Sequence, residues 1–423
     1  MDINQLLQGV DCACGKKHTC EIKSVYIEKN AAARLTALCC DYRHILLVAD
    51  ENTFAAAGGA VAAALQGKEI TRVIFPGATI LVPNEEAIGA VQAALGDVEL
   101  IVGIGAGVIQ DLCKYVSHYS KVPYIIVATA PSMDGYAANG AAMITGGMKV
   151  TYATALPLAI VADTDVLANA PMEMIKAGYG DVVGKFSALN DWKLSRCVNG
   201  EYFCDEIYRM TAEQITKTLD LAQGLLKREE ESVKTLMEAL VIIGILMSFA
   251  GSSRPASGSE HHLSHYFEIT GILDKTDYFP HGIDVAYSTV VTAELREKIL
   301  AGQFPQKRYR PTKEQYEAAM QKIYGSAADG CMALQERVGN YAKDRTGIYL
   351  QKEAEIREIL AEMPSADEIR RLLALVEMDM AEFYAFYGKE KVDNAVRYAK
   401  DLKDRYTVLW LYYDFWGDGE HVQ

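Results

Sequence analysis

Residues 100–114, LIVGIGAGVIQDLCK, decide the fold. An apolar run leads into Gly103, Gly105 and Gly107, and a helical pattern follows at once. Glycines at a strand-to-helix turn let backbone N–H groups approach a phosphate, and the positive end of the helix dipole then faces the anion. The stretch therefore predicts an α/β unit with a phosphate-binding turn, although any tight turn uses glycine as well.

Short apolar runs recur on both sides of this stretch and alternate with helical patterns. The runs are continuous, as in strands that are buried on both faces. The predicted strands are 45–49, 72–75, 100–103, 124–128 and 158–162, and the predicted helices between them are 53–65, 85–95 and 109–117. This order predicts a parallel sheet with helices on both sides.

After Pro171 the sequence carries long helical patterns and few strand signals. The clearest helical patterns are 205–226, 232–250, 313–338 and 365–387. Glycine and proline mostly mark their ends. We therefore expect two domains, an α/β dinucleotide-binding domain at 1–168 and an all-α domain at 169–423. The aromatic segment WLYYDFW at 410–416 favours a core or a subunit interface over a ligand site.

The charge balance excludes several function classes. The 423 residues include 42 Lys and Arg against 56 Asp and Glu, a net charge of −14, so the chain has no general attraction for nucleic acid or anionic lipid. The N-terminus lacks the features of a signal peptide, and the most apolar stretch, 239–250, is short for a membrane span. Nine cysteines, of which only the N-terminal group is regularly spaced, favour a reduced, cytoplasmic protein.

Cys12, Cys14, His18 and Cys20 lie within nine residues, CACGKKHTC. Side chains of these types are compatible with a small zinc site. The Cys-x-Cys spacing is tighter than the usual Cys-x₂-Cys, however, and no second half follows nearby. We therefore favour a short surface hairpin whose thiols hold no metal.

Polar side chains follow two of the predicted strands. Asp50 closes one strand, where its carboxylate can accept hydrogen bonds from a ribose diol or cap the next helix. Thr129, Ser132 and Asp134 follow a later strand in VATAPSMDG. Ligands of open α/β sheets gather beyond the carboxyl ends of the strands, although an ordinary polar loop contains the same residue types.

Three histidines gather in one window. His261 and His265 share one face of a helix if SGSEHHLSH is helical, and His281 follows a turn in PHG. Two imidazoles from different elements and one carboxylate make a three-ligand metal site with a position open for substrate. The best carboxylate is Asp181 in GYGD, because the glycines let a helix start close beside a neighbour. Hydrogen-bonded structural histidines remain the alternative.

The order of these motifs resembles a known superfamily. GAGVIQDLCK, TAPSMDG, GYGD, SGSEHHLSH and PHG are similar to motifs of the glycerol dehydrogenase, dehydroquinate synthase and iron-containing alcohol dehydrogenase superfamily. Within it, the segments SRPASGSEH at 253–261, TAPSMDG at 129–135 and GDVVGKFSALNDW at 180–192 resemble the bacterial sn-glycerol-1-phosphate dehydrogenase family most. The resemblance covers residues 45–286 and implies a dinucleotide-binding α/β domain followed by a helical domain.

The resemblance also implies a nicotinamide cofactor, NAD(H) or NADP(H). Its expected contacts are the pyrophosphate cradle Gly105, Ala106, Gly107, Val108 and Ile109, the lining residues Thr129 and Ser132, and Asp50 at the adenosine ribose. Ala106 stands where a third consecutive glycine is common in the family, and Ala138 where the family has a serine that contacts the cofactor. Asp50 favours NADH, because a carboxylate would repel a 2′-phosphate.

One divalent metal, zinc, nickel or iron, is the second implied cofactor. Its implied ligands are Asp181, His261 and His281. Asp134 and His265 are the implied catalytic residues and contact the substrate together with Asp181. A phosphorylated substrate also needs a cation, for which Arg254 is our first candidate and Lys185 the second.

The implied reaction is reversible hydride transfer between NAD(P)H and dihydroxyacetone phosphate, which gives sn-glycerol 1-phosphate. The metal polarises the carbonyl, and His265 or a water at the metal supplies the proton. The alternatives are a glycerol dehydrogenase or another polyol or sugar-phosphate dehydrogenase, a dehydroquinate synthase-like lyase, and a non-catalytic nucleotide-binding regulator. We expect a cytoplasmic homo-oligomer, taken as a dimer, that binds neither nucleic acid nor membrane.

Overall fold

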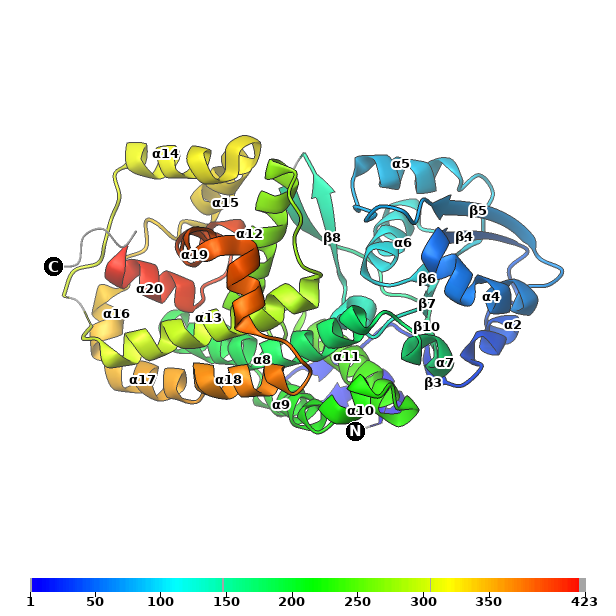
Figure 1. Cartoon of the computed structure of the whole chain (residues 1–423), viewed down its shortest axis with the longest axis horizontal. Helices are drawn as coiled ribbons and strands as arrows, with labels where there is room; N and C mark the ends of the chain where they lie inside the picture. Colours follow the sequence, from blue (N-terminus) through cyan, green and yellow to red (C-terminus); the bar gives the residue numbers. More distant parts are fainter. Residues whose placement is uncertain (1, 147, 305, 418–423) are drawn as a thin grey trace. The chain divides into compact units, whose positions relative to one another are not determined.

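The computed structural model describes residues 2–146, 148–304 and 306–417. They fall into two compact units, and Figure 1 labels many of their helices and strands. The first unit comprises the residues up to 145, 149–182 and 209–253, and the second comprises Gly146, Met148, 183–208 and the residues from 254 on. This division differs from the predicted boundary at 168/169, because α11 (Glu230–Ala250) packs against elements of the first unit, including β3 (Ser24–Glu28).

The first unit is built on a six-stranded parallel sheet, as predicted. Its order is β3-β10-β7-β6-β4-β5. The strands are β3, β4 (His44–Asp50), β5 (Glu69–Phe75), β6 (Leu100–Gly105), β7 (Tyr124–Ala128) and β10 (Ala159–Asp163). Five of them coincide with the predicted runs. The sequence pattern missed β3 because this edge strand, SVYIE, is mostly half-buried and has no continuous apolar run.

Helices cover both faces of this sheet. On one face, alternate residues such as Leu47 and Val102 form a core with Val61 and Leu65. On the other, α6 (Gly107–Ser120) contacts β4, β6 and β7. The remaining helices of this unit are α1 (Ile3–Leu7), η1 (Ala31–Arg34), α2 (Leu35–Leu38), α3 (Glu51–Thr53), η2 (Phe54–Gly58), α4 (Gly59–Ala64), α5 (Glu85–Ala93), η3 (Asp134–Ala137), α7 (Thr164–Ala168) and α10 (Ala222–Leu226).

Two small sheets complete the strands that the structure describes. The pair β1 (Val10–Asp11) and β2 (Lys17–His18) is antiparallel, so the predicted N-terminal hairpin is present. The other pair is β8 (Gly140–Thr145) and β9 (Met148–Ala153).

The strand order of the large sheet reverses beside β4. The chain passes from β4 to β5 on one side and then returns to β6 on the other side. Open α/β sheets bind ligands at the carboxyl ends of strands beside such a switch point. Asp50 ends β4 and Gly105 ends β6, so the topology places two of the predicted cofactor residues at this point.

The second unit is helical, which confirms the prediction that the C-terminal part of the chain is all-α. Its helices are α12 (Ser259–Asp274), α13 (His281–Ala301), α14 (Lys313–Tyr324), η4 (Gly325–Ala327), α15 (Ala328–Val338), α16 (Thr346–Gln351), α17 (Glu353–Ala361), α18 (Ala366–Ala374), α19 (Met380–Tyr398), η5 (Ala399–Leu402) and α20 (Val408–Trp416). Two further helices, α8 (Met172–Asn199) and α9 (Asp205–Leu219), each cross a boundary between the units. The aromatic α20 is core, with Trp410 1% exposed.

Among the described residues, α11 alone is long and apolar enough to cross a membrane by length and composition. Most of its apolar window, 72%, is buried inside the fold, as in a core helix.

Candidate active site

The predicted phosphate turn joins β6 to α6. A Cβ on Gly105 would lie 2.6 Å from the Ile109 Cβ, so the turn admits only glycine there. The first hydrogen bond of the helix runs from the Gln110 N–H to the Ala106 carbonyl, 2.9 Å. The N–H groups of Gly107, Val108 and Ile109 therefore have no acceptor within the helix and lie at its positive end, an arrangement suited to a phosphate.

The loop after β7 is tied to this turn. The Thr129 N–H donates to the Gly105 carbonyl, 3.2 Å, and the Tyr136 hydroxyl donates to the Ala130 carbonyl, 2.7 Å. Thr129 and Ser132 are both buried. The two loops that the sequence assigned to the cofactor therefore lie side by side.

Lys114 forms hydrogen bonds with the chain that follows β7, a role that the sequence did not predict. Its Nζ donates to the carbonyls of Gly135 and Gly140, 3.0 and 2.8 Å, and lies 3.4 Å from Asp111 Oδ1. Burial lowers the pKa of Lys114, and Asp111 opposes that shift. The i, i+3 spacing of an acid and a lysine on a buried helix face was the available signal. Lys114 thereby fixes the loop that carries Asp134.

Asp50 caps the helical segment that follows β4. Its Oδ1 accepts from the Thr53 N–H, 2.9 Å, and the Thr53 hydroxyl accepts from the Asp50 N–H, 3.1 Å. The capping alternative is therefore confirmed. Because Oδ1 accepts the capping hydrogen bond, a contact with the adenosine ribose would use Oδ2.

Asp181 is fully buried in α8 and accepts from the Asp134 N–H through Oδ2, 2.9 Å. One turn earlier, a Cβ on Gly178 would lie 1.8 Å from the Pro131 carbonyl oxygen. The close approach expected of GYGD is present, but α8 begins at Met172, so the motif lies inside the helix rather than at its start.

The second unit brings the three predicted histidines together. His261 and His265 lie one turn apart on α12, and His281 is the first residue of α13. The ring centroids of His261 and His281 are 5.0 Å apart, those of His265 and His281 are 5.7 Å apart, and those of His261 and His265 are 6.3 Å apart. A ring nitrogen of His261 lies within 4.8 Å of one of His281.

Hydrogen bonds orient two of these rings. Glu260 Oε1 accepts from His261 Nδ1, 2.6 Å, and Ser264 Oγ lies 3.2 Å from His281 Nδ1. Burial raises the pKa of Glu260, but its hydrogen bonds with His261 and the Gly258 N–H act in the opposite direction. The net effect is a pKa below the ordinary value. An ionised carboxylate on Nδ1 orients the ring so that Nε2 of His261 could bind a metal. The sequence reasoning missed Glu260, although the acid directly before His261 was visible.

Arg254, the first candidate for the substrate phosphate, makes several hydrogen bonds within the second unit. Its guanidinium is buried, donates through Nε to Glu201 Oε1, 2.7 Å, and donates through Nη1 to the Tyr406 carbonyl, 2.8 Å. These bonds make it a structural cross-link within the second unit. Lys185 is fully buried on α8, one turn after Asp181.

His262 differs from these three histidines in its environment. It is fully buried, and neither ring nitrogen has a hydrogen-bond partner among the described residues. Burial, with Arg405 nearby, lowers the pKa of His262 well below its ordinary value. The imidazole is therefore neutral and structural, in line with the absence of a predicted role.

Comparison with known proteins identifies the family. The sequence model of the iron-containing alcohol dehydrogenase family matches residues 26–171. A glycerol-1-phosphate dehydrogenase of Halalkalibacterium halodurans is 36% identical over 95% of this chain and 94% of that protein. The chain belongs to the glycerol-1-phosphate dehydrogenase family. A second member, from Geobacillus stearothermophilus, is 29% identical over 97% of this chain and 98% of its own.

The family's fold also appears among solved structures. An iron-containing alcohol dehydrogenase from Thermococcus thioreducens superimposes with a TM-score of 0.58 over 94% of this chain and 99% of that chain, at 14% identity. At this identity the likeness shows the fold alone, and it confirms the predicted α/β unit with a helical partner.

Proposed function

We propose that this chain is an NAD(P)-dependent oxidoreductase that interconverts dihydroxyacetone phosphate and sn-glycerol 1-phosphate with a divalent metal. The observation that carries the proposal is the pair His261 and His281, held with ligand nitrogens within 4.8 Å in a chain that belongs to this family. The relatives are named as NAD(P)⁺ glycerol-1-phosphate dehydrogenases.

The residues at the switch point fit a dinucleotide. The N–H groups of Gly107, Val108 and Ile109 suit the pyrophosphate, and they need no basic side chain in this acidic protein. Gly105 and Ala106 complete the cradle, while Thr129 and Ser132 line the cofactor and Asp50 meets its adenosine ribose. The missing serine at Ala138 removes one side-chain contact from this set.

The histidine pair fits a metal. Asp181 is the third ligand in the proposal, because its Oδ2 is already oriented by the Asp134 N–H, 2.9 Å. One carboxylate and two imidazoles leave a coordination position for substrate and suit zinc, nickel or iron. When bound, the metal polarises the substrate carbonyl as a Lewis acid, and the nicotinamide carries the hydride.

The remaining residues position the substrate and move the proton. His265 lies on the same face of α12 as His261 and holds or releases the proton at the substrate oxygen. Asp134 accepts a hydrogen bond from a substrate hydroxyl. Lys185 is the cation for the phosphate in place of Arg254, whose guanidinium is occupied by Glu201.

The test is an assay of NADH and NADPH oxidation at equal concentrations of dihydroxyacetone phosphate and dihydroxyacetone. The protein is first treated with chelator and then resupplied with zinc, nickel or iron. We expect turnover with the phosphorylated substrate, dependent on metal. Equal turnover of dihydroxyacetone would replace the proposal with a glycerol dehydrogenase, and no turnover with any metal would refute it.

Replacing Glu260 with glutamine is expected to weaken the active-site metal roughly 10–100-fold. Glutamine keeps the shape but loses the charge that holds the proton on His261 Nδ1. Metal affinity is measured by competition with a chromogenic chelator. Glu268→Gln, two turns later on α12, is the matched control. Equal affinities in the two variants would show that Glu260 does not support the site.

Replacing Asp50 with serine separates its two roles. Serine is a good N-cap, so the helix after β4 keeps its stability, but the carboxylate is gone. We expect the ratio of kcat/KM for NADPH over NADH to rise roughly tenfold, about 1.4 kcal/mol. Asp50→Ala should change the ratio equally and also lose about 1 kcal/mol of stability. An unchanged ratio in both variants would remove Asp50 from the cofactor site.

We also propose that the enzyme is cytoplasmic and forms dimers. Light scattering of the purified protein tests the oligomeric state, and a monomer or a larger assembly would replace the dimer.

A further inference from the structure

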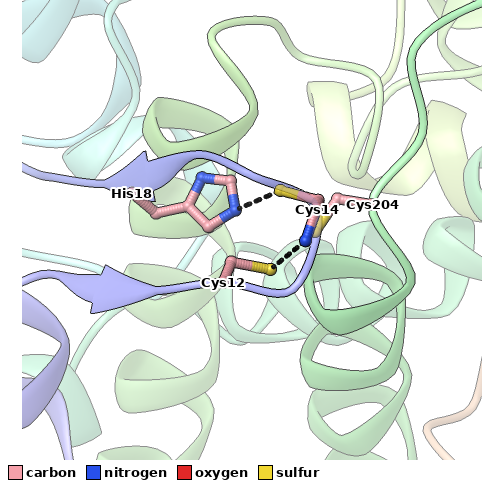
Figure 2. Close-up of side chains that lie close together, drawn as sticks. All are labelled: Cys12, Cys14, His18 and Cys204. Carbon is pink, nitrogen blue, oxygen red and sulfur yellow. Dashed lines mark hydrogen bonds between the residues drawn. The ribbon is translucent and has the colours of Figure 1, made fainter.

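The N-terminal hairpin carries a second group of metal-type side chains. Val10 of β1 pairs with His18 of β2, and the turn between the strands holds Cys12 and Cys14. One ligand atom from each of Cys12, Cys14 and His18 lies within 4.8 Å of the others. His18 is only 1% exposed. Its ring points at the turn, with Nε2 3.4 Å from Cys14 Sγ (Figure 2).

The packing of His18 selects one of its two nitrogens. Nδ1 lies 3.0 Å from the Phe249 carbonyl at the end of α11, and the ring stacks on the Phe249 ring with centroids 5.5 Å apart. A carbonyl only accepts, so Nδ1 donates, and in this tautomer of the imidazole Nε2 carries the lone pair, which points toward Cys14 Sγ. A histidine whose Nδ1 is held by a carbonyl is the usual form of a metal ligand.

The turn positions the two thiols. Gly15 donates its N–H to the Cys12 carbonyl, 3.0 Å, and Cys12 donates its own N–H to the Lys16 carbonyl, 3.2 Å. The Cys14 N–H donates to Cys12 Sγ, 3.5 Å, which orients this sulfur within the turn (Figure 2). Both cysteines are partly exposed, so an ion can reach them from solvent.

We propose that Cys12, Cys14 and His18, with Cys204 as the fourth ligand, bind one zinc ion that is distinct from the active-site metal. Cys204 is buried and stands directly before α9. Figure 2 draws its side chain together with the other three.

The donor set defines the kind of site. Three thiolates and one imidazole are soft ligands that select zinc over calcium or magnesium, and four protein ligands leave no open position. The site is therefore structural.

The test uses the full chain loaded with cobalt(II), which replaces zinc and absorbs light. Cobalt bound to thiolates gives a sulfur-to-metal charge-transfer band that an aspartate and two histidines cannot give. We expect two metal ions per chain and this band in the wild type. Cys12→Ser and Cys204→Ser should each lose the band and one ion. His281→Ala should lose one ion and keep the band, and Cys20→Ser, the matched control, should keep both ions and the band.

Other outcomes overturn the proposal. One metal ion per chain, abolished by His281→Ala and without a charge-transfer band, would leave the cysteines as plain thiols. A band that survives Cys204→Ser would refute the four-ligand site. A wild-type protein that is metal-free at the hairpin and two mass units lighter than its reduced form would show a disulfide instead. If a serine variant fails to fold, the wild-type spectrum and metal count still decide.

Discussion

Replacing His281 with alanine is expected to remove one metal ion per chain and to lower kcat with dihydroxyacetone phosphate by at least roughly 100-fold. Substituting a residue that merely supports a metal ligand costs roughly 10–100-fold, and His281 would be a ligand itself. The ring stands at the first position of α13, with His261 at a centroid distance of 5.0 Å and Nδ1 beside Ser264. Removal leaves one imidazole and one carboxylate of the proposed ligand set, which together hold a divalent ion poorly.

The measurement pairs metal analysis with steady-state kinetics. His118→Ala, in the last turn of α6, is the matched control, because it removes an imidazole far along another helix. Its metal content and kcat should match the wild type. A His281→Ala protein that turns over fully in the presence of chelator would refute the metal mechanism, while leaving the family membership untouched.

The parallel sheet was predictable because its inner strands are continuous apolar runs. β4 and β6 are buried along nearly their whole length, and only sequences such as HILLVAD and LIVGIG meet that demand. The edge strand β3 was not predictable in this way, because one flank of an edge strand tolerates charge. The predicted helix 313–338 is two helices, since Gly325 adopts φ +48° between α14 and α15.

The candidate site was predictable where side-chain chemistry is local in sequence. His261 and His265 are one helical turn apart, so their shared face follows from spacing alone. Contacts between residues far apart in the sequence were not predictable. Nothing in the local sequence shows that Arg254 bonds to Glu201, which lies 53 residues away.

Replacing Gly178 with alanine is expected to destabilise the first unit by about 3 kcal/mol or more and to abolish activity. The added Cβ would lie 1.8 Å from the Pro131 carbonyl oxygen, and its next contact is the carbonyl carbon at 2.9 Å. Backbone cannot swing aside as a flexible side chain can, so α8 or the loop after β7 must move. Overpacking of this kind typically costs about 1–3 kcal/mol, and more where the obstacle is rigid.

The displacement reaches the chemistry because both sides of the contact carry site residues. Pro131 lies between Thr129 and Asp134, and Asp181 follows Gly178 by one turn, so the 2.9 Å bond from the Asp134 N–H to Asp181 spans the same contact. Gly59→Ala is the matched control. Its backbone is helical, φ −63° and ψ −46°, and no heavy atom lies within 4 Å of the new Cβ, so about 0.5–1 kcal/mol of stability should be gained. Thermal unfolding and kcat well below the transition distinguish the two variants. An unchanged melting temperature and full activity in Gly178→Ala would mean that α8 does not approach the loop as closely as the glycine implies, and that Asp181 is positioned by other contacts.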